Sequence, residues 1–222
     1  TAQKQFSANA AHELRTPLAV IQTNLEVFAR REAPALKDYQ EIFAMLQEQT
    51  GRLSHLAEIL LDMTGVQTVE RSERISLAAL TDEVFCDLAS IAEQKDVELI
   101  QQEGDCIITG SYLLLYRAVY NLVENAIKYN HSGGKVTVNI HPSEEITDTS
   151  TSVNYVFLEV SDTGIGIPPE YQEKIFTPFF RVDKSRSRAM GGAGLGLALV
   201  SEIVRQHNGQ VTVSYTHLTL PT

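Results

Sequence analysis

A histidine and a glutamate stand side by side in a segment whose pattern predicts a helix. The segment from Phe6 to Leu18 reads FSANAAHELRTPL, with His12 next to Glu13. An ionised carboxylate that accepts the Nδ1 proton of an imidazole leaves Nε2 as a nucleophile. Pro17 removes one backbone hydrogen bond, so we expect it to kink or loosen the helix beside His12. The pair predicts a nucleophilic histidine; an exposed pair without function is the alternative.

Two carboxamides and one ammonium recur along a second predicted helix. Asn121, Asn125 and Lys128 lie within roughly 60° of one another around a helix axis. Carboxamide oxygens suit a hard cation such as Mg²⁺, and lysine suits phosphate. The stripe predicts a site for a metal-bound phosphate, with a solvated polar face as the alternative.

Two glycine-rich segments could bring the backbone close to a ligand. The segment DTGIGIP begins at Asp162, whose carboxylate can accept a hydrogen bond from an exocyclic amine, and its glycines allow close approach to a flat ring. The segment GGAGLGL begins at Gly191 and opens a predicted helix, so its amides form an anion cradle. A basic run precedes it and predicts a phosphate-facing loop, or alternatively a solvated one; its cations are Arg181, Lys184, Arg186 and Arg188.

Two long helices must position His12. Apolar residues at spacings of three and four form one stripe over residues 6–28 and a heptad stripe over residues 42–63. The segment 31–38 contains Pro34 and predicts the turn between them. Because an antiparallel hairpin cannot enclose its own apolar seam, we expect a second copy to complete a four-helix bundle and hence a homodimer. A monomer that packs the hairpin on its own C-terminal domain is the alternative.

Strands and helices alternate in the rest of the chain. The patterns predict helices over 80–94, 111–130 and 195–207, with Ser111 as an N-cap, and a hairpin loop over 143–154. They predict strands over 75–77, 97–100, 106–109, 136–141, 153–161 and 210–213. The fold class is therefore α+β: an N-terminal helical hairpin, then an α/β sandwich with helices on one face of a mixed sheet.

The composition excludes several classes of protein. The 222 residues carry 18 Lys and Arg against 28 Asp and Glu, a net charge of −10, so we expect no nucleic-acid partner. No apolar run approaches the roughly 18 residues of a membrane span. Cys86 and Cys106 are too few for a disulfide framework, and without a His/Cys cluster we expect no structural zinc.

Taken in order, five segments resemble the boxes of bacterial sensor histidine kinases. Residues 6–18 resemble the H-box, 121–130 the N-box, 162–167 the first glycine box, 176–181 the F-box and 191–197 the second glycine box. The resemblance implies a dimerisation and phosphotransfer hairpin over 1–65, a linker over 66–74 and a GHKL-type ATP-binding domain over 75–213.

The resemblance also implies roles for residues of the first two boxes. His12 would be the phosphoacceptor, Glu13 would orient and activate it, and Thr16 would help to place water for dephosphorylating a response regulator. Asn125 would hold Mg²⁺ with the assistance of Asn121.

The remaining matches concern ATP. The resemblance implies that Asp162 reads the adenine amine and that Lys128 and Arg181 touch phosphates. Tyr129 would pack near the nucleotide. Two glycines, Gly164 and Gly166, would shape the adenine pocket, and two phenylalanines, Phe176 and Phe180, would anchor the lid. Three further glycines would wrap the phosphates: Gly192, Gly194 and Gly196.

The function implied is ATP-dependent autophosphorylation on His12 and transfer of the phosphoryl group to an aspartate of a cognate response regulator, with regulator phosphatase activity. One alternative is a GHKL-type ATPase, but those enzymes place a catalytic glutamate four residues before the metal-binding asparagine, where this chain has Asn121. A degenerate, truncated kinase that acts as a dimeric scaffold is the other alternative.

Both ends of the chain carry expectations. Residues 214–222 lack the glycine-bearing turn that the family places before a final Leu-Pro strand. We hypothesise that this tail is a translated sequencing adapter and that the last strand is missing. Upstream of Thr1 we expect sensor and membrane segments, which would make this chain the cytoplasmic portion of a protein anchored in the inner membrane.

Overall fold

A computed structural model describes residues 2–65, 69–142, 155–182 and 193–213. The chain divides into two compact units: residues 1–65 with 177–195, and residues 66–176 with 196–222. Each unit is described by itself.

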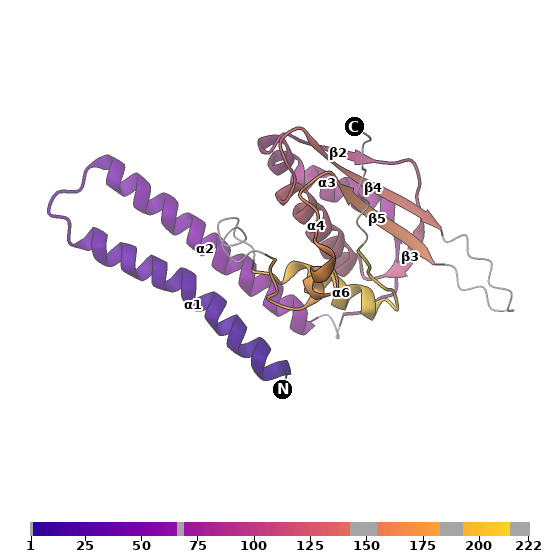
Figure 1. The fold of residues 1–222 in the computed structure, drawn as a ribbon, viewed down its shortest axis with the longest axis horizontal. Coiled ribbons are helices and arrows are strands. Elements are labelled where there is room, and N and C mark those ends of the chain that lie inside the picture. Colours follow the sequence, from indigo (N-terminus) through magenta and orange to yellow (C-terminus); the bar gives the residue numbers. More distant parts are fainter. Residues whose placement is uncertain (1, 66–68, 143–154, 183–192, 214–222) are drawn as a thin grey trace, which may run out of the picture. The chain divides into compact units, whose positions relative to one another are not determined.

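The first unit contains the predicted helical hairpin. Helices α1 (Ala2–Ala29) and α2 (Leu36–Gly65) lie side by side and antiparallel (Figure 1). The rings of Phe28 and Tyr39 meet edge to face across the turn, with centroids 5.0 Å apart. Asp38 accepts a hydrogen bond from the Ala35 amide and pairs with Arg31, which together lower the pKa of its carboxyl. Helix α1 continues through Pro17, so the proline does not end it.

The second unit confirms the predicted mixed sheet. Its three strands are ordered β2 (Val97–Gln101), β4 (Gly134–Pro142) and β5 (Val156–Asp162), with β2 parallel and β5 antiparallel to β4. Strands β1 (Glu73–Ser76) and β3 (Ile107–Gly110) form a separate antiparallel pair.

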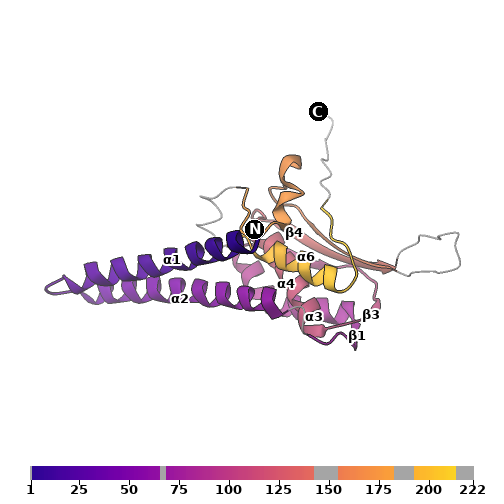
Figure 2. The ribbon, with the colours of Figure 1, turned by 90° about the horizontal axis from the view of Figure 1, so that it is seen from below.

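Helices α3 (Leu77–Gln94) and α4 (Tyr112–Lys128) pack on one face of the sheet, as the sequence predicts (Figure 2). Helix α6 (Gly196–Gln206) packs on α4. Two short 3₁₀ turns, Pro169–Tyr171 and Lys174–Phe176, follow β5. None of the helices in the described ranges is long and apolar enough to cross a membrane.

The core lies between these helices and the sheet. Alternate residues of β4, Val136, Val138 and Ile140, are buried, as expected for a strand with one face on the core. Leu88 of α3 and Ile127 of α4 are fully buried in the same core. Burial of each such large side chain stabilises the fold by about 1.5–3 kcal/mol. This packing fixes α4, which carries the polar stripe.

Tyrosines on α4 fasten it to α3. The Tyr112 hydroxyl donates to Glu83, and the Tyr116 hydroxyl donates to Asp87. The bond to Glu83, with partial burial, raises the pKa of Tyr112 to about 12. Burial and the bond to Asp87 also raise the pKa of Tyr116. Both tyrosines therefore stay protonated donors at neutral pH.

Two local expectations need correction. Residues 210–213 are not a strand, because no ladder joins them to any strand in the described part of the chain, and an extended segment without a partner leaves its amides unpaired. Ser111 occupies the N-cap position of α4, but its hydroxyl makes no capping bond; its own amide donates instead to His207 Nε2, 3.1 Å away. The loop 143–154 and the tail 214–222 lie outside the described residues.

The start of α3 yields a stability prediction with a pH dependence. Asp105 accepts hydrogen bonds from the Ala78 amide (3.0 Å) and the Ser76 hydroxyl (2.9 Å), and these bonds lower its pKa below the ordinary value of 3.8. A carboxylate with a depressed folded-state pKa stabilises the fold above its unfolded pKa and loses this contribution as pH falls through the folded value. Asp105→Ala should reduce the free energy of unfolding by about 1 kcal/mol at pH 7, as measured by urea denaturation.

Measuring the free energy of unfolding at several pH values separates capping by Asp105 from a general effect of charge. The difference between the parent chain and Asp105→Ala should shrink once the pH drops below 3.8. Glu103→Ala removes an exposed carboxylate two residues away and should leave stability nearly unchanged. An equal loss in both variants would contradict a capping role for Asp105.

Candidate functional site

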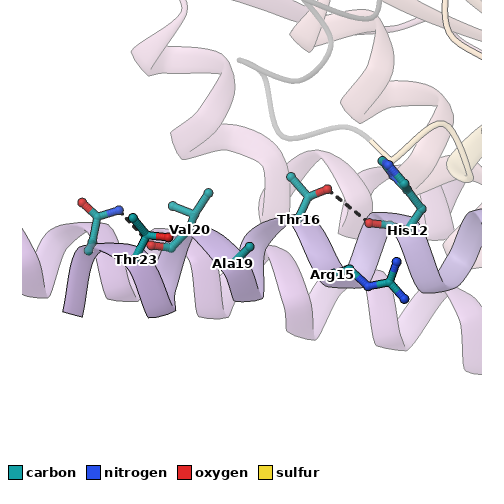
Figure 3. A pocket seen from close by; sticks show the side chains of 7 residues that line it. His12, Arg15, Thr16, Ala19, Val20 and Thr23 are labelled. Atoms are coloured by element: carbon teal, nitrogen blue, oxygen red, sulfur yellow. Dashed lines mark hydrogen bonds between the residues drawn. The ribbon is translucent and has the colours of Figure 1, made fainter. Parts of the chain in front are cut away.

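The predicted nucleophile is exposed on α1. His12 and Thr16 project from the same side of the helix (Figure 3), and the Thr16 hydroxyl donates to the His12 carbonyl oxygen over 3.2 Å. An open pocket of about 510 Å³ runs along this helix, lined by His12, Arg15, Thr16, Ala19, Val20, Thr23 and Asn24. The imidazole is therefore accessible to a reactant from solvent.

Glu13 has a partner that sequence reasoning did not foresee. Within the first unit its carboxylate forms an ion pair with Arg181. Adjacent residues on a helix do not face each other, so Glu13 is poorly placed to reach the His12 ring directly while α1 is regular. The structure thus brings together two predicted site residues from segments far apart in the sequence.

The segment around Phe179 is held in an unusual conformation. Phe179 has φ of 66°, a left-handed value that costs a residue with a side chain on the order of 1–2 kcal/mol. Its amide donates to the Gly194 carbonyl oxygen over 2.7 Å, and its ring lies 5.4 Å from that of Phe6. Sequence reasoning named neither Phe6 nor Phe179 as a site residue; the paired aromatics at 179–180 were the available signal.

Gly194 is required by its surroundings. Its φ is 70°, and a Cβ there would lie 2.6 Å from the Phe180 carbonyl oxygen. The Arg181 guanidinium reaches the Ala193 carbonyl oxygen at 3.5 Å. The end of the F-box and the second glycine box therefore pack against each other, as two parts of one phosphate site would.

The carboxamide stripe lies on α4 in the second unit. Asn121 is buried, and its Nδ2 donates to the Arg117 carbonyl oxygen over 2.8 Å. Its Oδ1 faces Gly196, where a Cβ would come within 2.5 Å. Asn125 is half-buried one turn further along α4. Amide oxygens of this kind fit the hard-oxygen preference of Mg²⁺, so the residues present suit that ion.

The end of α4 touches the first glycine box. The Tyr129 carbonyl oxygen accepts a hydrogen bond from the Ile165 amide over 3.2 Å, and a Cβ on Gly164 would lie 2.5 Å from the same oxygen. The Lys128 ammonium lies 5.8 Å from the centroid of the Tyr129 ring. The end of the N-box and the first glycine box are therefore in direct contact.

Asp162 ends β5 with a fixed carboxylate. Its Oδ1 accepts the Gly164 amide over 2.8 Å, which leaves the other oxygen available to an exocyclic amine. Gly166 has φ of 68°, so glycine is favoured there. Thr163 and Asn130 support this turn, since the Thr163 hydroxyl donates to Asn130 Oδ1 over 3.1 Å. Sequence reasoning did not foresee this support.

Other predicted residues are placed less informatively. Phe176 is half-buried in the 3₁₀ turn Lys174–Phe176. Gly192 and the cations Lys184, Arg186 and Arg188 lie outside the described residues.

Two known domain families match the chain. Residues 2–68 match the His Kinase A (phospho-acceptor) domain. Residues 110–221 match the family described as histidine kinase-, DNA gyrase B- and HSP90-like ATPase.

Curated relatives match almost the whole chain. Sensor histidine kinase RppB from Synechocystis is 37% identical over 217 residues, which are 95% of this chain and 46% of that protein. Sensor histidine kinase WalK from Bacillus subtilis is 33% identical over 215 residues, which are 94% of this chain and 34% of that protein. The chain therefore spans less than half the length of these relatives.

Solved structures share the fold. Histidine kinase AdeS from Acinetobacter baumannii superposes with a TM-score of 0.64 at 24% identity, over 88% of this chain and 86% of that one. Histidine kinase ThkA, in complex with response regulator protein TrrA, gives 0.67 at 22% identity, over 92% of this chain and 55% of that one.

The two close glycine contacts predict different effects on stability. In Gly196→Ala the new methyl group meets only the end of the Asn121 side chain, which can rotate, so we expect a folded chain with about tenfold weaker Mg-ATP binding. In Gly164→Ala it meets the Tyr129 backbone carbonyl, which cannot rotate away, so both stability and binding should fall. Calorimetric titration and thermal melting measure the two effects.

Gly51→Ala is the matched control. Nothing lies within 4 Å of the position of its Cβ, and Gly51 is inside α2, so alanine should raise stability by roughly 0.5–1 kcal/mol and leave nucleotide binding unchanged. Unaltered Mg-ATP affinity in Gly196→Ala would show that Asn121 does not hold the metal-bound nucleotide.

Proposed function

We propose, from the premise that this chain belongs to the sensor histidine kinase family, that it transfers the γ-phosphoryl group of ATP to His12. The observation that carries the proposal is the contact of one helix, α4, with both glycine boxes. Asn121 lies against Gly196, and the Tyr129 carbonyl oxygen lies against Gly164. Contacts this close favour glycine at both positions and form a backbone-lined surface suited to a nucleotide.

The chemical step is an in-line displacement at phosphorus. His12 Nε2 attacks the γ-phosphorus of ATP, the bond from that phosphorus to the bridging oxygen breaks, and ADP leaves with the electron pair. The new N–P bond is a phosphoramidate. Glu13 would accept the Nδ1 proton of the resulting imidazolium as the activating base. This step requires α1 to depart from a regular helix beside Pro17, because adjacent residues of a regular helix do not face each other.

Charge stabilisation comes from the residues around the phosphates. When bound, Mg²⁺ would neutralise phosphate charge, and Asn125 with Asn121 would hold it. Lys128 and Arg181 would contact phosphate oxygens, Asp162 would accept a hydrogen bond from the adenine amine, and Gly192 would complete the glycine cradle. Arg181 is paired with Glu13 in this structure. Exchange of that carboxylate for a phosphate would release Glu13 to act on His12.

The phosphoryl group would then pass to an aspartate of a response regulator. Supporting this partner, the related kinase ThkA is seen in complex with response regulator protein TrrA. Thr16 projects beside His12, where its hydroxyl could orient a water molecule for dephosphorylation of the regulator. Anchoring of the whole protein in the inner membrane is part of the proposal and rests on the family alone.

A homodimer is the proposed assembly. Several large apolar side chains of the hairpin are exposed to solvent, and such exposed apolar surface is typical of a protein–protein interface. They include Leu25, Val27, Leu36 and Phe43. A second copy of the hairpin would bury them in a four-helix bundle.

His12→Gln tests the phosphoacceptor. Incubation with γ-labelled ATP and magnesium should give the parent chain an acid-labile, base-stable label. Glutamine keeps a polar side chain of similar length but cannot form a phosphoramidate, so the variant should lose more than about 99% of the label. Its ATP affinity should stay within about twofold of the parent value, because no contact with the nucleotide in its ground state is removed.

His55→Gln is the matched control, since His55 is an exposed histidine on α2. It should label like the parent chain. Labelling of His12→Gln at the parent rate would place the phosphoacceptor elsewhere and refute the assignment.

Phe43→Glu tests the dimer. The Phe43 side chain is 62% exposed, and a carboxylate there would have to be buried, uncompensated, in the bundle. Light scattering after gel filtration should show the mass of a dimer for the parent chain and of a monomer for the variant. Gln40→Glu places the same charge at an exposed polar position of α2 and should remain dimeric. A dimeric Phe43→Glu would remove this residue from the interface.

A further inference from the structure

Lys95, directly after α3, closes the C-terminal end of α4. Its ammonium donates to the Lys128 carbonyl oxygen and reaches the Ile127 carbonyl oxygen at 3.5 Å. The last carbonyl groups of a helix have no partner inside it, and a cation there also interacts favourably with the helix dipole. Lys95 thus supplies, from a distant segment, hydrogen bonds to the last carbonyl groups of α4. This is the helix that carries Asn121, Asn125 and Lys128.

The next residue ties the same two segments together a second time. Asp96 has φ of 56°, and its carbonyl oxygen accepts the Gly133 amide over 2.7 Å. Its carboxylate accepts the Ser132 hydroxyl over 2.8 Å. The parallel pairing of β2 with β4 then begins at Val97 and Gly134. The turn after α3 and the turn after α4 are therefore one connected piece of structure.

The end of α4 is in direct contact with the first glycine box. The Tyr129 carbonyl oxygen holds the Ile165 amide, and it leaves no space for a methyl group on Gly164. The Gly164 amide in turn fixes Asp162 Oδ1. Because the Ile165 amide, the Gly164 backbone and Asp162 Oδ1 form one hydrogen-bonded turn against the Tyr129 carbonyl oxygen, a shift of that oxygen would change the position of the Asp162 carboxylate.

We propose that Lys95 is a positioning residue of the nucleotide site: its ammonium fixes the end of α4, and thereby the carboxylate of Asp162, without touching the nucleotide. The inference rests on the proposed function, since it takes Asp162 as the group that reads the adenine amine. It assigns to Lys95 a role in ATP affinity and base selectivity that differs from simple stabilisation of a helix end.

The test compares Lys95→Met with Lys95→Arg and Lys95→Gln in the whole chain. Methionine keeps most of the aliphatic stem and removes the charge and the donors. We expect the dissociation constant for a fluorescent ATP analogue and the KM for ATP to rise about fivefold, with the preference for ATP over GTP reduced, while kcat at saturating ATP stays within about twofold. Arginine should restore most of the affinity, and glutamine, a neutral donor, should restore part of it.

Lys135→Met is the matched control. The Lys135 ammonium pairs with Glu98 at 2.8 Å on the neighbouring strands, and both side chains are more than half exposed. Its loss removes a cation from the same region without uncapping α4, so ATP affinity and selectivity should not change. Equal effects in Lys135→Met and Lys95→Met would reduce the role of Lys95 to general electrostatics and overturn the proposal.

Hydrogen exchange at the Ile165 amide gives a second readout that needs no nucleotide. In Lys95→Met, and to a smaller degree in Lys95→Gln, this amide should exchange faster than in the parent chain, because its acceptor is the Tyr129 carbonyl oxygen. A lower melting temperature with unchanged affinity, selectivity and exchange at Ile165 would show a purely structural cap and overturn the proposal. A parent chain that binds no ATP would instead overturn the proposed function, and with it this inference.

Discussion

The fit of α4 between two glycine boxes is the constraint on which the proposed nucleotide site depends. At Gly164 and at Gly196, the space next to the backbone is already taken by atoms of α4 or of the residue that follows it. The other face of the helix is buried in the core through Val123 and Ile127, which holds the helix in this position. A single helix therefore has one face that packs in the apolar core and another that carries the polar stripe of the proposed site.

Helix ends in this unit are completed by residues from distant segments. The first turn of α3 is capped with the help of Asp105, the Ser111 amide before α4 is accepted by His207, and the last turn of α4 is closed by Lys95. Unpaired helix-end groups are costly when they are shielded from water, so these long-range bonds restrict how the helices can move. The site-bearing helix is consequently fixed at both of its ends.

Around His12 the constraint is electrostatic. The carboxylate of Glu13, next to the proposed phosphoacceptor, is paired with Arg181, which the F-box contributes. Phe179, held in a left-handed conformation by its bond to Gly194, brings its ring to Phe6 in the same unit. In the proposed mechanism, sharing of Arg181 between Glu13 and a phosphate group would link occupancy of the nucleotide site to the freedom of Glu13, because one guanidinium cannot satisfy both fully.

The sequence by itself determined the hairpin, the mixed sheet with α3 and α4 on one face, and the boxes proposed to carry the chemistry. These follow from periodicity and from residue types at short spacing, which act locally along the chain. The prediction of a strand at 210–213 was wrong, because a strand forms only when it pairs with another strand, and this pairing depends on the tertiary structure. Only the tertiary structure decided that Glu13 meets Arg181 and that Lys95 closes α4, since contacts between segments dozens of residues apart leave no periodic trace in the sequence.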